Sequence, residues 1–395
     1  MRILHVVTNA DLGGAPRVVT ELANRAVAAG HTCGAASVPM GPFWDHLDPR
    51  VEQLPLRHLR RSLDPLQDFL AVLELISLFR RWEPDVVHVH SSKAGMLGRT
   101  AALLTSRRIA TVYTIHGFDT ILRTHHVFLP LEKTMARFTS AIVPVSAYDE
   151  ANLYKIGIGR MALAKAGNDR SHAKAPLIRL IHNGASDRLG AVPQAAVAAR
   201  IEAARASGAV IVLTVARLEE PKRFDLFVEA ARRFSGDTNQ GQSQDKQLPK
   251  VSFFWIGNVQ RVDPSELPAN VEMLGEVPEA GNCINLCDIF LLLSAYEGLP
   301  MSILEALSCA KPVVASNVGG NGEAVGTDGK AGILVPNDAD AVVAALSPLA
   351  VDPDLRAAMG QAARKRYEAG FSAETMWRSY LRLYQNLYEK SRGVI

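Results

Sequence analysis

The stretch IFLLLSAYEGLPMSILEALSCAKPVVAS, residues 289–316, contains two apolar runs separated by a turn and a helical segment. The first run, IFLLLS (289–294), and the last, KPVVAS (311–316), have the length and apolar character of buried strands. A Gly-Leu-Pro turn at 298–300 opens the helical segment between them. This order of strand, helix and strand is typical of a parallel α/β sheet, and it places Glu297 at the carboxyl end of the first strand.

A second glutamate, Glu305, follows Glu297 by eight positions. Eight helical residues rise about 12 Å, so the two side chains lie on roughly the same face. Carboxylates accept hydrogen bonds from hydroxyl groups, and the free N–H groups of a helix N-terminus bind phosphate. The pattern therefore predicts a site for a polyhydroxylated, anionic ligand.

The length and the charge distribution suggest two different halves. A chain of 395 residues exceeds what one hydrophobic core usually supports, so two domains are expected. Residues 1–190 hold 23 Lys and Arg against 16 Asp and Glu, a net charge of +7, and the remainder holds 20 against 24, a net charge of −4. The basic half indicates either an anionic partner (phosphate, lipid or nucleic acid) or chance scatter.

The cysteines and the apolar runs indicate the compartment. The four cysteines lack zinc-site spacing, and we expect buried free thiols: Cys33, Cys283, Cys287 and Cys309. The first residues resemble a strand rather than a signal peptide, and no apolar run approaches the roughly 18 residues of a membrane span. We therefore expect a cytoplasmic protein, or one peripheral at the inner face of the cytoplasmic membrane.

Strands alternate with helices along both halves. In the first half we expect strands at 2–8, 85–91, 111–117 and 141–146 and helices at 14–30, 65–82, 93–106 and 128–139. In the second half we expect strands at 210–216, 251–257, 271–275, 289–294, 312–316 and 332–336 and a helix at 224–234. The predicted fold class is α/β, with two doubly wound Rossmann-like domains whose parallel sheets face each other across a cleft.

The domain limits follow from the same alternation. Residues 1–186 should form the first domain and residues 187–372 the second. An amphipathic helix at about 373–390 is expected to pack back on the first domain. The polar segment 235–250 is interpreted as a mobile surface loop.

Three further loops at predicted strand ends carry candidate ligand-binding residues. Gly13 and Gly14 lie between a strand and a helix, where they either admit a ligand close to the backbone or form a plain turn. His116 ends a strand and has either a structural role or a hydrogen bond to a ligand. Arg217 and Lys222 stand at the start of a helix and can bracket a diphosphate.

For these two cations the alternative is surface ion pairing with Glu219 and Glu220. The Asp-x-Asp at Asp338 to Asp340 is interpreted as a helix start rather than a metal site.

Taken in order, segments along nearly the whole chain resemble the retaining glycosyltransferases of family 4, which have the GT-B fold. The most specific of them is EGLPMSILEALSCAKPVVAS followed by GGNGE at 319–323. The others are LGGAPRVV, HVHSSKAGMLGR, TIHGF, VSAYDEANL and VARLEEPKRFD.

The resemblance implies a role for each candidate residue. Glu305 would bind the ribose of a nucleotide-sugar, and Glu297 the hydroxyls of the donor sugar. Arg217 and Lys222 would hold the diphosphate, and His116 would lie beside the transferred sugar. Two residues, His116 and Glu297, are thus the catalytic candidates. Backbone amides in the segment from Leu299 to Ser302, and those of Gly14, would support phosphate or sugar. The donor-binding residues would thus be Gly13, Gly14, Leu299, Pro300, Met301 and Ser302, together with Arg217, Lys222 and Glu305.

The resemblance also implies a reaction, in which the first domain (residues 1–186) binds the acceptor and the second (residues 187–372) binds the nucleotide-sugar donor. A sugar would pass from a UDP-sugar, or alternatively a GDP-sugar, to a glycan or to a polyprenyl-diphosphate-linked oligosaccharide. Cations and amide dipoles would stabilise the diphosphate as it leaves, so neither a metal nor another cofactor is expected. The alternatives are a sugar-nucleotide epimerase of the same fold and a non-catalytic nucleotide-sugar-binding protein.

A segment at 54–84 that is both basic and apolar suggests a surface at which a lipid-linked acceptor is bound. Its arginines either rest on an anionic membrane surface or are solvated around a core-facing helix: Arg57, Arg60, Arg61, Arg80 and Arg81. Nucleic acid is not expected as a partner.

The sequence departs from the family pattern at three places. Ser186 replaces an acidic residue, Arg223 replaces a glycine and adds charge near the diphosphate site, and Gly257-Asn258 replaces Gly-Asp-Gly.

Overall fold

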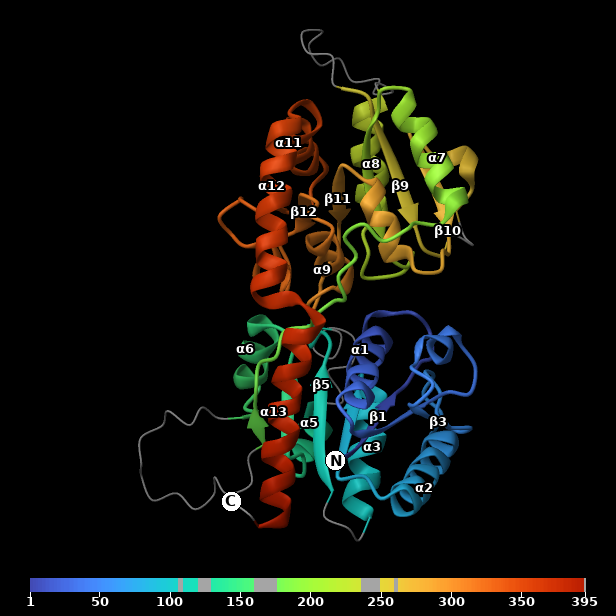
Figure 1. Cartoon of the computed structure of the whole chain (residues 1–395), viewed down its shortest axis with the longest axis vertical. Helices are drawn as coiled ribbons and strands as arrows, with labels where there is room; N and C mark the ends of the chain where they lie inside the picture. The colour runs from blue at the N-terminus through green and yellow to red at the C-terminus, as the bar shows by residue number, and fades with distance from the viewer. Residues whose placement is uncertain (106–108, 120–128, 160–175, 236–248, 259–261, 394–395) are drawn as a thin grey trace. The chain divides into compact units, whose positions relative to one another are not determined.

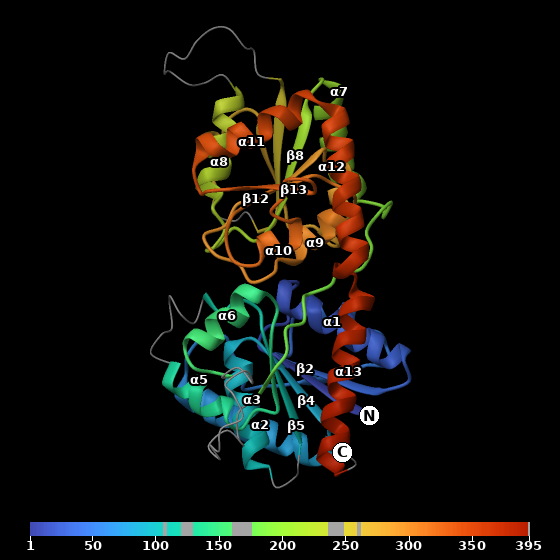
Figure 2. The same ribbon diagram turned by 90° about the vertical axis from the view of Figure 1, so that its left-hand side faces the viewer.

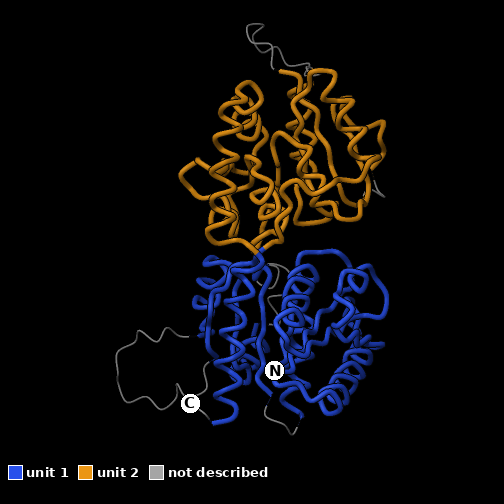
Figure 3. Tube along the Cα trace, in the orientation of Figure 1, with its two compact units in different colours: residues 1–184, 373–395 blue, residues 185–372 orange. Residues whose placement is uncertain are grey.

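The computed structural model describes residues 1–105, 109–119, 129–159, 176–235, 249–258 and 262–393. The chain divides into two compact units, residues 1–184 with 373–395 and residues 185–372, coloured separately in Figure 3. The boundary expected after residue 186 lies two residues from this division. Because the C-terminal helix belongs to the first unit, the chain enters the second unit and then returns to the first.

The first unit is built on a parallel sheet of seven strands, in the order β3-β2-β1-β4-β5-β6-β7. The strands are β1 (Arg2–Val7), β2 (Thr32–Ser37), β3 (Glu52–Pro55), β4 (Val86–His90), β5 (Ala110–Ile115), β6 (Ala141–Pro144) and β7 (Leu177–Ile178). Its described helices are α1 (Gly14–Ala28), α2 (Pro65–Trp82), α3 (Ser92–Leu104), α5 (Leu129–Ala136), α6 (Ala147–Lys155) and α13 (Ala373–Arg392), with a 3₁₀ turn at Pro42–His46.

The two faces of this sheet differ. Side chains alternate between the faces of a strand, so the residues on either side of His88, Val87 and Val89, join the apolar core that α2 and α3 cover. The opposite face carries His88 and His90, and there α13 lies against α1, β4 and β5 (Figures 1 and 2). The C-terminal helix thus closes a polar face of the sheet, because its tyrosines hydrogen bond to β4 and β5.

The second unit repeats the architecture with six parallel strands, in the order β10-β9-β8-β11-β12-β13. These are β8 (Val210–Val215), β9 (Val251–Ile256), β10 (Val271–Gly275), β11 (Ile289–Leu292), β12 (Val313–Ser316) and β13 (Gly332–Val335). The described helices are α7 (Ala195–Ala206), α8 (Phe224–Ser235), α9 (Met301–Ser308), α10 (Asn321–Val325), α11 (Ala339–Val351) and α12 (Pro353–Arg366). Short 3₁₀ turns lie at Pro264–Glu266 and Ala280–Leu286, and a π turn at Tyr367–Phe371.

The expected elements are present, usually one or two residues shorter. The alternation missed β2 and β3, because TCGAAS and EQLP lack the apolar character of a central strand. Most of the expected loop, 236–248, lies outside the described residues. All four cysteines are buried and free, as predicted. Among the described helices, none is long and apolar enough to cross a membrane.

Candidate active site

The turn that carries Glu297 is fixed by a buried polar network at the carboxyl ends of β11 and β12. Ser294 donates its N–H to Ser316 Oγ (2.9 Å) and accepts from Asn337 Nδ2 at its carbonyl (2.9 Å). Ser316 Oγ in turn donates to Asn337 Oδ1 (2.6 Å). Buried polar groups with satisfied hydrogen bonds hold the backbone in one conformation. The backbone that leads into Glu297 is therefore rigid.

The loop after β12 lies directly against this turn. Gly320 donates its N–H to the carbonyl of Gly298 (2.8 Å). Gly319 has a positive φ of 52°, and a Cβ there would lie 1.8 Å from the carbonyl oxygen of Glu297. Only glycine fits such an approach. The GGNGE segment therefore supports the turn that presents Glu297.

The carboxylate of Glu297 forms an ion pair with Lys222, and Ser294 Oγ donates to its Oε1 (2.6 Å). Only 11% of the Glu297 side chain and 17% of the Lys222 side chain are exposed. The sequence assigned these two residues to different parts of the ligand and did not predict that they pair. Lys222 is thus held at the end of β11 by Glu297.

Arg217 lies in the loop after β8 and is exposed. Trp255 Nε1 donates to the carbonyl of Ala216 (2.9 Å), and Leu218 donates its N–H to Asn258 Oδ1 (2.6 Å). Asn258, one of the departures from the family pattern, therefore fixes the loop that presents Arg217.

Arg223 was expected to add positive charge near the diphosphate site, but it is paired with a neighbouring carboxylate. Its guanidinium bonds both carboxylate oxygens of Asp225, with Nη2 to Oδ2 at 2.6 Å. This neighbour lowers the pKa of Asp225. The charge that Arg223 adds is therefore compensated locally.

Helix α9 begins immediately after Pro300, and no side chain caps its N-terminus. The first amides of a helix have no partner within it. Leu299 and Met301 are buried and Ser302 is partly exposed, so the predicted phosphate-binding amides lie at a helix start. The dipole of α9 favours an anion at this end.

Glu305 lies one turn further along α9 and is only 3% exposed. Its carboxylate rests against Gly281, in the 3₁₀ turn before β11. A Cβ at Gly281 would lie 2.9 Å from Oε1 and 3.1 Å from Oε2. The absence of a side chain at Gly281 thus makes room for the carboxylate. No sequence motif singled out this glycine, because the contact joins distant segments.

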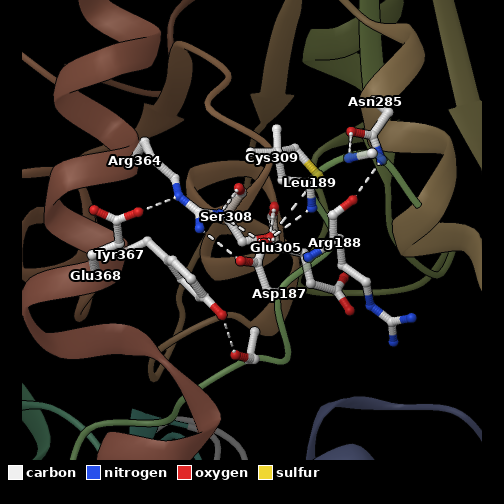
Figure 4. Close-up of polar contacts among 12 residues, drawn as sticks. Asp187, Arg188, Leu189, Asn285, Glu305, Ser308, Cys309, Arg364, Tyr367 and Glu368 are labelled. Carbon is white, nitrogen blue, oxygen red and sulfur yellow. Dashed lines mark hydrogen bonds and ion pairs between the residues drawn. The ribbon is translucent and has the colours of Figure 1, made fainter.

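The C-terminal end of α9 is anchored by the network in Figure 4. Arg364 donates to the carbonyl of Ser308 (2.6 Å) and pairs with Asp187 (2.6 Å), and this bonding lowers the pKa of Asp187. Ser308 Oγ accepts from the N–H of Arg188 (3.2 Å) and donates to the carbonyl of Glu305 (2.7 Å). A cation at a helix C-terminus also stabilises the dipole. This network holds the backbone of Glu305 in place.

In the first unit, the glycine loop after β1 is bonded within itself. Gly13 donates its N–H to Asp11 Oδ1 (3.0 Å), and Gly14, the first residue of α1, is exposed. Of the two predicted glycines, Gly14 is therefore the one placed at the open end of the helix.

His116 follows β5, and its loop is held by Asp149 of α6. Phe118 donates its N–H to Asp149 Oδ1 (2.8 Å), and Ser146 Oγ donates to Asp149 Oδ2 (2.9 Å). His116 Nε2 lies 3.2 Å from His90 Nδ1. Burial lowers the pKa of His116 to about 4, so its ring is neutral near pH 7.

Three buried histidines in the first unit place ring nitrogens within 4.8 Å of one another: His5, His88 and His90. Both nitrogens of His88 already have partners, the hydroxyls of Tyr384 (2.6 Å) and Thr114 (2.7 Å). His5 Nδ1 and His90 Nε2 face each other at 3.2 Å. The geometry is that of a hydrogen-bonded row rather than a set of metal ligands.

Each unit thus brings its own candidates together. In the second unit, Lys222 touches Glu297, while Arg217 and the start of α9 follow the neighbouring strands β8 and β11. In the first unit, the Gly13 loop follows β1 and His116 follows β5, with β4 between these strands. At Asp338 the helix start is confirmed, because its carboxylate caps α11 through the N–H of Ala341 (2.9 Å).

Comparison with known proteins identifies the class. Residues 12–167 match the family described as Glycosyltransferase Family 4, and residues 198–366 match the one described as Glycosyl transferases group 1. The two matches, with two Rossmann-like units, define a GT-B glycosyltransferase. More particularly, the chain carries a Glycosyltransferase Family 4 domain followed by a Glycosyl transferases group 1 domain.

Two curated relatives illustrate the similarity. The UDP-Gal:alpha-D-GlcNAc-diphosphoundecaprenol alpha-1,3-galactosyltransferase of Escherichia coli is 26% identical, over 84% of this chain and 83% of the relative. The capsular polysaccharide biosynthesis glycosyltransferase CapM of Staphylococcus aureus is 23% identical, over 85% of both chains.

Solved structures share the fold. Anabaena Alr3699/HepE, solved in complex with UDP-glucose, superimposes with a TM-score of 0.76 at 18% identity, over 98% of this chain and all of that one. The sucrose-phosphate synthase of Thermosynechococcus elongatus gives 0.76 at 20% identity, over 99% and 100%. The predicted fold and enzyme class are therefore confirmed.

Proposed function

We propose that this enzyme is a retaining glycosyltransferase that moves a sugar from a nucleotide-sugar, with a UDP-sugar as first choice, to a glycan or lipid-linked oligosaccharide in polysaccharide biosynthesis. The observation that carries the proposal is the Lys222–Glu297 pair beside the uncapped start of α9. One of the two curated relatives is named for capsular polysaccharide biosynthesis, and the name of the other contains a UDP-sugar and a diphosphoundecaprenol-linked sugar.

The donor is recognised by the two glutamates in different ways. Glu305, buried beside Gly281, accepts hydrogen bonds from the ribose hydroxyls. Glu297 accepts them from the hydroxyls of the transferred sugar. When the donor binds, the ammonium group of Lys222 shifts part of its contact from the Glu297 carboxylate to the diphosphate. The Glu297 carboxylate is then free to bind the sugar.

The reaction places its charge on the leaving group. As the bond between the anomeric carbon and the diphosphate oxygen breaks, its electron pair goes to that oxygen. Lys222, Arg217 and the first amides of α9 stabilise the growing negative charge. The acceptor hydroxyl attacks from the same face, and its proton goes to the leaving phosphate oxygen. Neutral His116 hydrogen bonds to the transferred sugar without adding charge.

Nucleotide release with defined donors tests this function. UDP-, GDP- and ADP-sugars are incubated with and without polyprenyl-diphosphate-linked acceptors, and the anomeric configuration of the product is read by NMR. We expect UDP release only with acceptor, and retention of configuration. Interconversion of the donor sugar without acceptor would instead identify the epimerase, and an inverted product would refute retention.

The α2 region favours a membrane surface for the lipid-linked acceptor. All five predicted arginines are exposed on the segment: Arg57, Arg60, Arg61, Arg80 and Arg81. The helix also exposes Leu66, Phe69 and Leu73, which share one face at positions i, i+3 and i+7. Exposed apolar residues beside basic ones fit an anionic bilayer surface better than solvent. We propose peripheral binding at the cytoplasmic leaflet.

Flotation with liposomes tests this surface. We expect binding to vesicles with anionic lipid and loss of binding in the double variant Leu66→Ser/Phe69→Ser. The variant Leu104→Ser, at an exposed apolar residue of α3, serves as the control. Absence of binding by the wild-type protein at low salt would refute the membrane proposal and leave the transferase proposal intact.

A further inference from the structure

Four histidines of the first unit lie in one row along the sheet face that α13 covers. His88 and His90 are two residues apart on β4, so they point to the same face, and His5 pairs in register with His88 on the adjacent β1. His90 pairs in register with Thr114, two residues before His116. The row thus runs from the buried middle of the sheet to its carboxyl edge.

The row consists of two separate hydrogen-bonded sets. His88 bonds Tyr384 and Thr114, as described above. The second set links three imidazoles: His5 Nδ1 faces His90 Nε2 at 3.2 Å, and His90 Nδ1 faces His116 Nε2 at 3.2 Å. Each end of this set has one covered nitrogen, His5 Nε2 and His116 Nδ1, without a hydrogen-bond partner among the described residues.

The protonation of the second set is restricted. Burial lowers the pKa of His5 to about 3, that of His116 to about 4, and that of His90 well below its ordinary value, so all three rings are neutral near pH 7. A neutral imidazole has one N–H donor and one acceptor nitrogen. Because both nitrogens of His90 are engaged, one donates and the other accepts. Only two arrangements satisfy both bonds.

The two arrangements differ at the ends of the set. With all protons on Nδ1, His5 donates to His90, His90 donates to His116, and His116 keeps a free Nδ1–H. With all protons on Nε2, the direction reverses and His116 keeps a bare Nδ1. Each arrangement therefore leaves one end nitrogen as an N–H and the other as a lone pair. In the first the N–H lies at His116, which is partly exposed at the carboxyl edge of the sheet, and in the second it lies at His5, which is fully buried. A buried N–H without an acceptor is rarer than an unsatisfied acceptor, and a ligand can supply an acceptor only at the edge of the sheet. The first arrangement is therefore favoured.

We propose that His90, oriented by His5, is a positioning residue that fixes His116 as the Nδ1–H tautomer, so that His116 presents a hydrogen-bond donor to an oxygen of its ligand. The ligand oxygen is a sugar hydroxyl or a phosphate oxygen, and this part rests on the proposed function. A donor at this position selects an acceptor oxygen, and its neutral charge leaves the charge balance of the transferred group unchanged. The tautomer itself is a property of the ligand-free protein.

The tautomer can be read directly. Long-range ¹H–¹⁵N correlation spectra of protein labelled with ¹⁵N-histidine distinguish Nδ1–H, Nε2–H and charged rings. At pH 7.5 we expect protonated Nδ1 and unprotonated Nε2 for His5, His90 and His116. An Nε2–H or charged His116 would overturn the proposal, as would resonances of the row that shift when a chelator is added. This experiment needs neither substrate nor variant.

Two substitutions at His90 then test the positioning role. His90→Asn keeps an amide donor near the place of Nδ1, whereas His90→Leu removes it. We expect the leucine variant to lose the single tautomer at His116 and to lower kcat at least 10-fold with little change in nucleotide Kd. The asparagine variant should retain most of the single tautomer at His116 and most of kcat. His58→Gln, at a histidine that bonds Gln67 outside the row, is the control and should change neither.

The outcomes separate the two proposals. If the wild-type protein transfers no sugar from any donor, the proposed function fails while the spectra still decide the tautomer. If the wild-type protein is active and folded His90→Leu keeps its kcat, the positioning role is refuted.

Discussion

The two units share a doubly wound parallel sheet but place different chemistry at its strand ends. The second unit presents paired charges, Lys222 with Glu297, beside a helix start. The first unit presents neutral polar groups, with His116 at the end of a row of uncharged imidazoles. All eleven histidines of the chain lie within residues 1–184. Under the proposed function, one architecture serves an anionic leaving group in one unit and uncharged hydroxyls in the other, because the loops and not the sheet determine the chemistry.

Charges inside the first unit have a structural role, and breaking them should produce the largest effect on stability. Arg99 and Glu132 are buried and bonded at 2.7 and 2.9 Å, and the guanidinium of Arg99 lies over the ring of Tyr113. Glu132→Ala leaves a buried charge unpaired, so we expect a loss of about 3–5 kcal/mol in the free energy of unfolding. Denaturant titration measures it. The exposed pair at Arg378 and Glu374 supplies the control, since Glu374→Ala should cost under about 1 kcal/mol. Equal losses of unfolding free energy in Glu132→Ala and Glu374→Ala would contradict the structural role of the buried pair.

Charges in the second unit should act mainly on catalysis. Lys222→Ala removes a cation beside the proposed leaving group, and we expect turnover to fall about 10²–10³-fold. It also leaves the mostly buried Glu297 carboxylate without its ion-pair partner, so we expect a loss of stability that is smaller than that of Glu132→Ala, whose pair is more deeply buried. Arg223→Ala is a matched control, because the adjacent cation is compensated by Asp225 and should lower turnover only slightly. Steady-state rates with the best donor decide between them. Equal effects of the two substitutions would show that general positive charge, and not Lys222, stabilises the diphosphate.

Glu305 should affect binding rather than turnover. Glu305→Ala is expected to weaken nucleotide binding by about 1–3 kcal/mol through loss of hydrogen bonds to ribose. Gly281→Ala should weaken binding in the same direction but less, because the new methyl group displaces a flexible carboxylate end. Calorimetry with UDP and GDP measures both. Unchanged affinity in Glu305→Ala would refute the ribose role.

The sequence predicted the periodic features well and the contacts between distant segments poorly. Strand β11, the turn at Glu297 and helix α9 follow from apolar runs and a Gly-Leu-Pro turn within one stretch. The Lys222–Glu297 pair, the space at Gly281 and the support from Asn258 join segments tens of residues apart, and no local pattern encodes them. The histidines of HVHS were visible as alternate positions on a strand. Their row could not be predicted, because it depends on the register of three strands and on the return of α13.

The histidine distribution also predicts which unit unfolds first in acid. The pKa of His116 is about 4 and that of His5 about 3 in the folded protein, both lowered by burial from an unfolded value near 6.5. Above pH 6.5 both states are neutral and these rings add no pH dependence. Below pH 6.5, these histidines bind protons in the unfolded chain but stay unprotonated in the folded protein. Stability therefore falls as the pH drops, by about 1.4 kcal/mol per pH unit for each buried histidine.

Hydrogen exchange followed by mass spectrometry can locate this loss, after correction for the intrinsic pH dependence of exchange. Between pH 6.5 and about 4, we expect protection to fall in β1, β4 and β5 while β8 and β11 change little. The second unit has no histidine. The carboxylates with lowered pKa there titrate only below this range: Asp187, Asp225, Asp263 and Asp328. His116→Asn should reduce the pH dependence of protection in the first unit by about one histidine's share. Parallel loss of protection in both units would mean that carboxylates, and not the buried imidazoles, govern acid unfolding, because only carboxylates are shared by the two units.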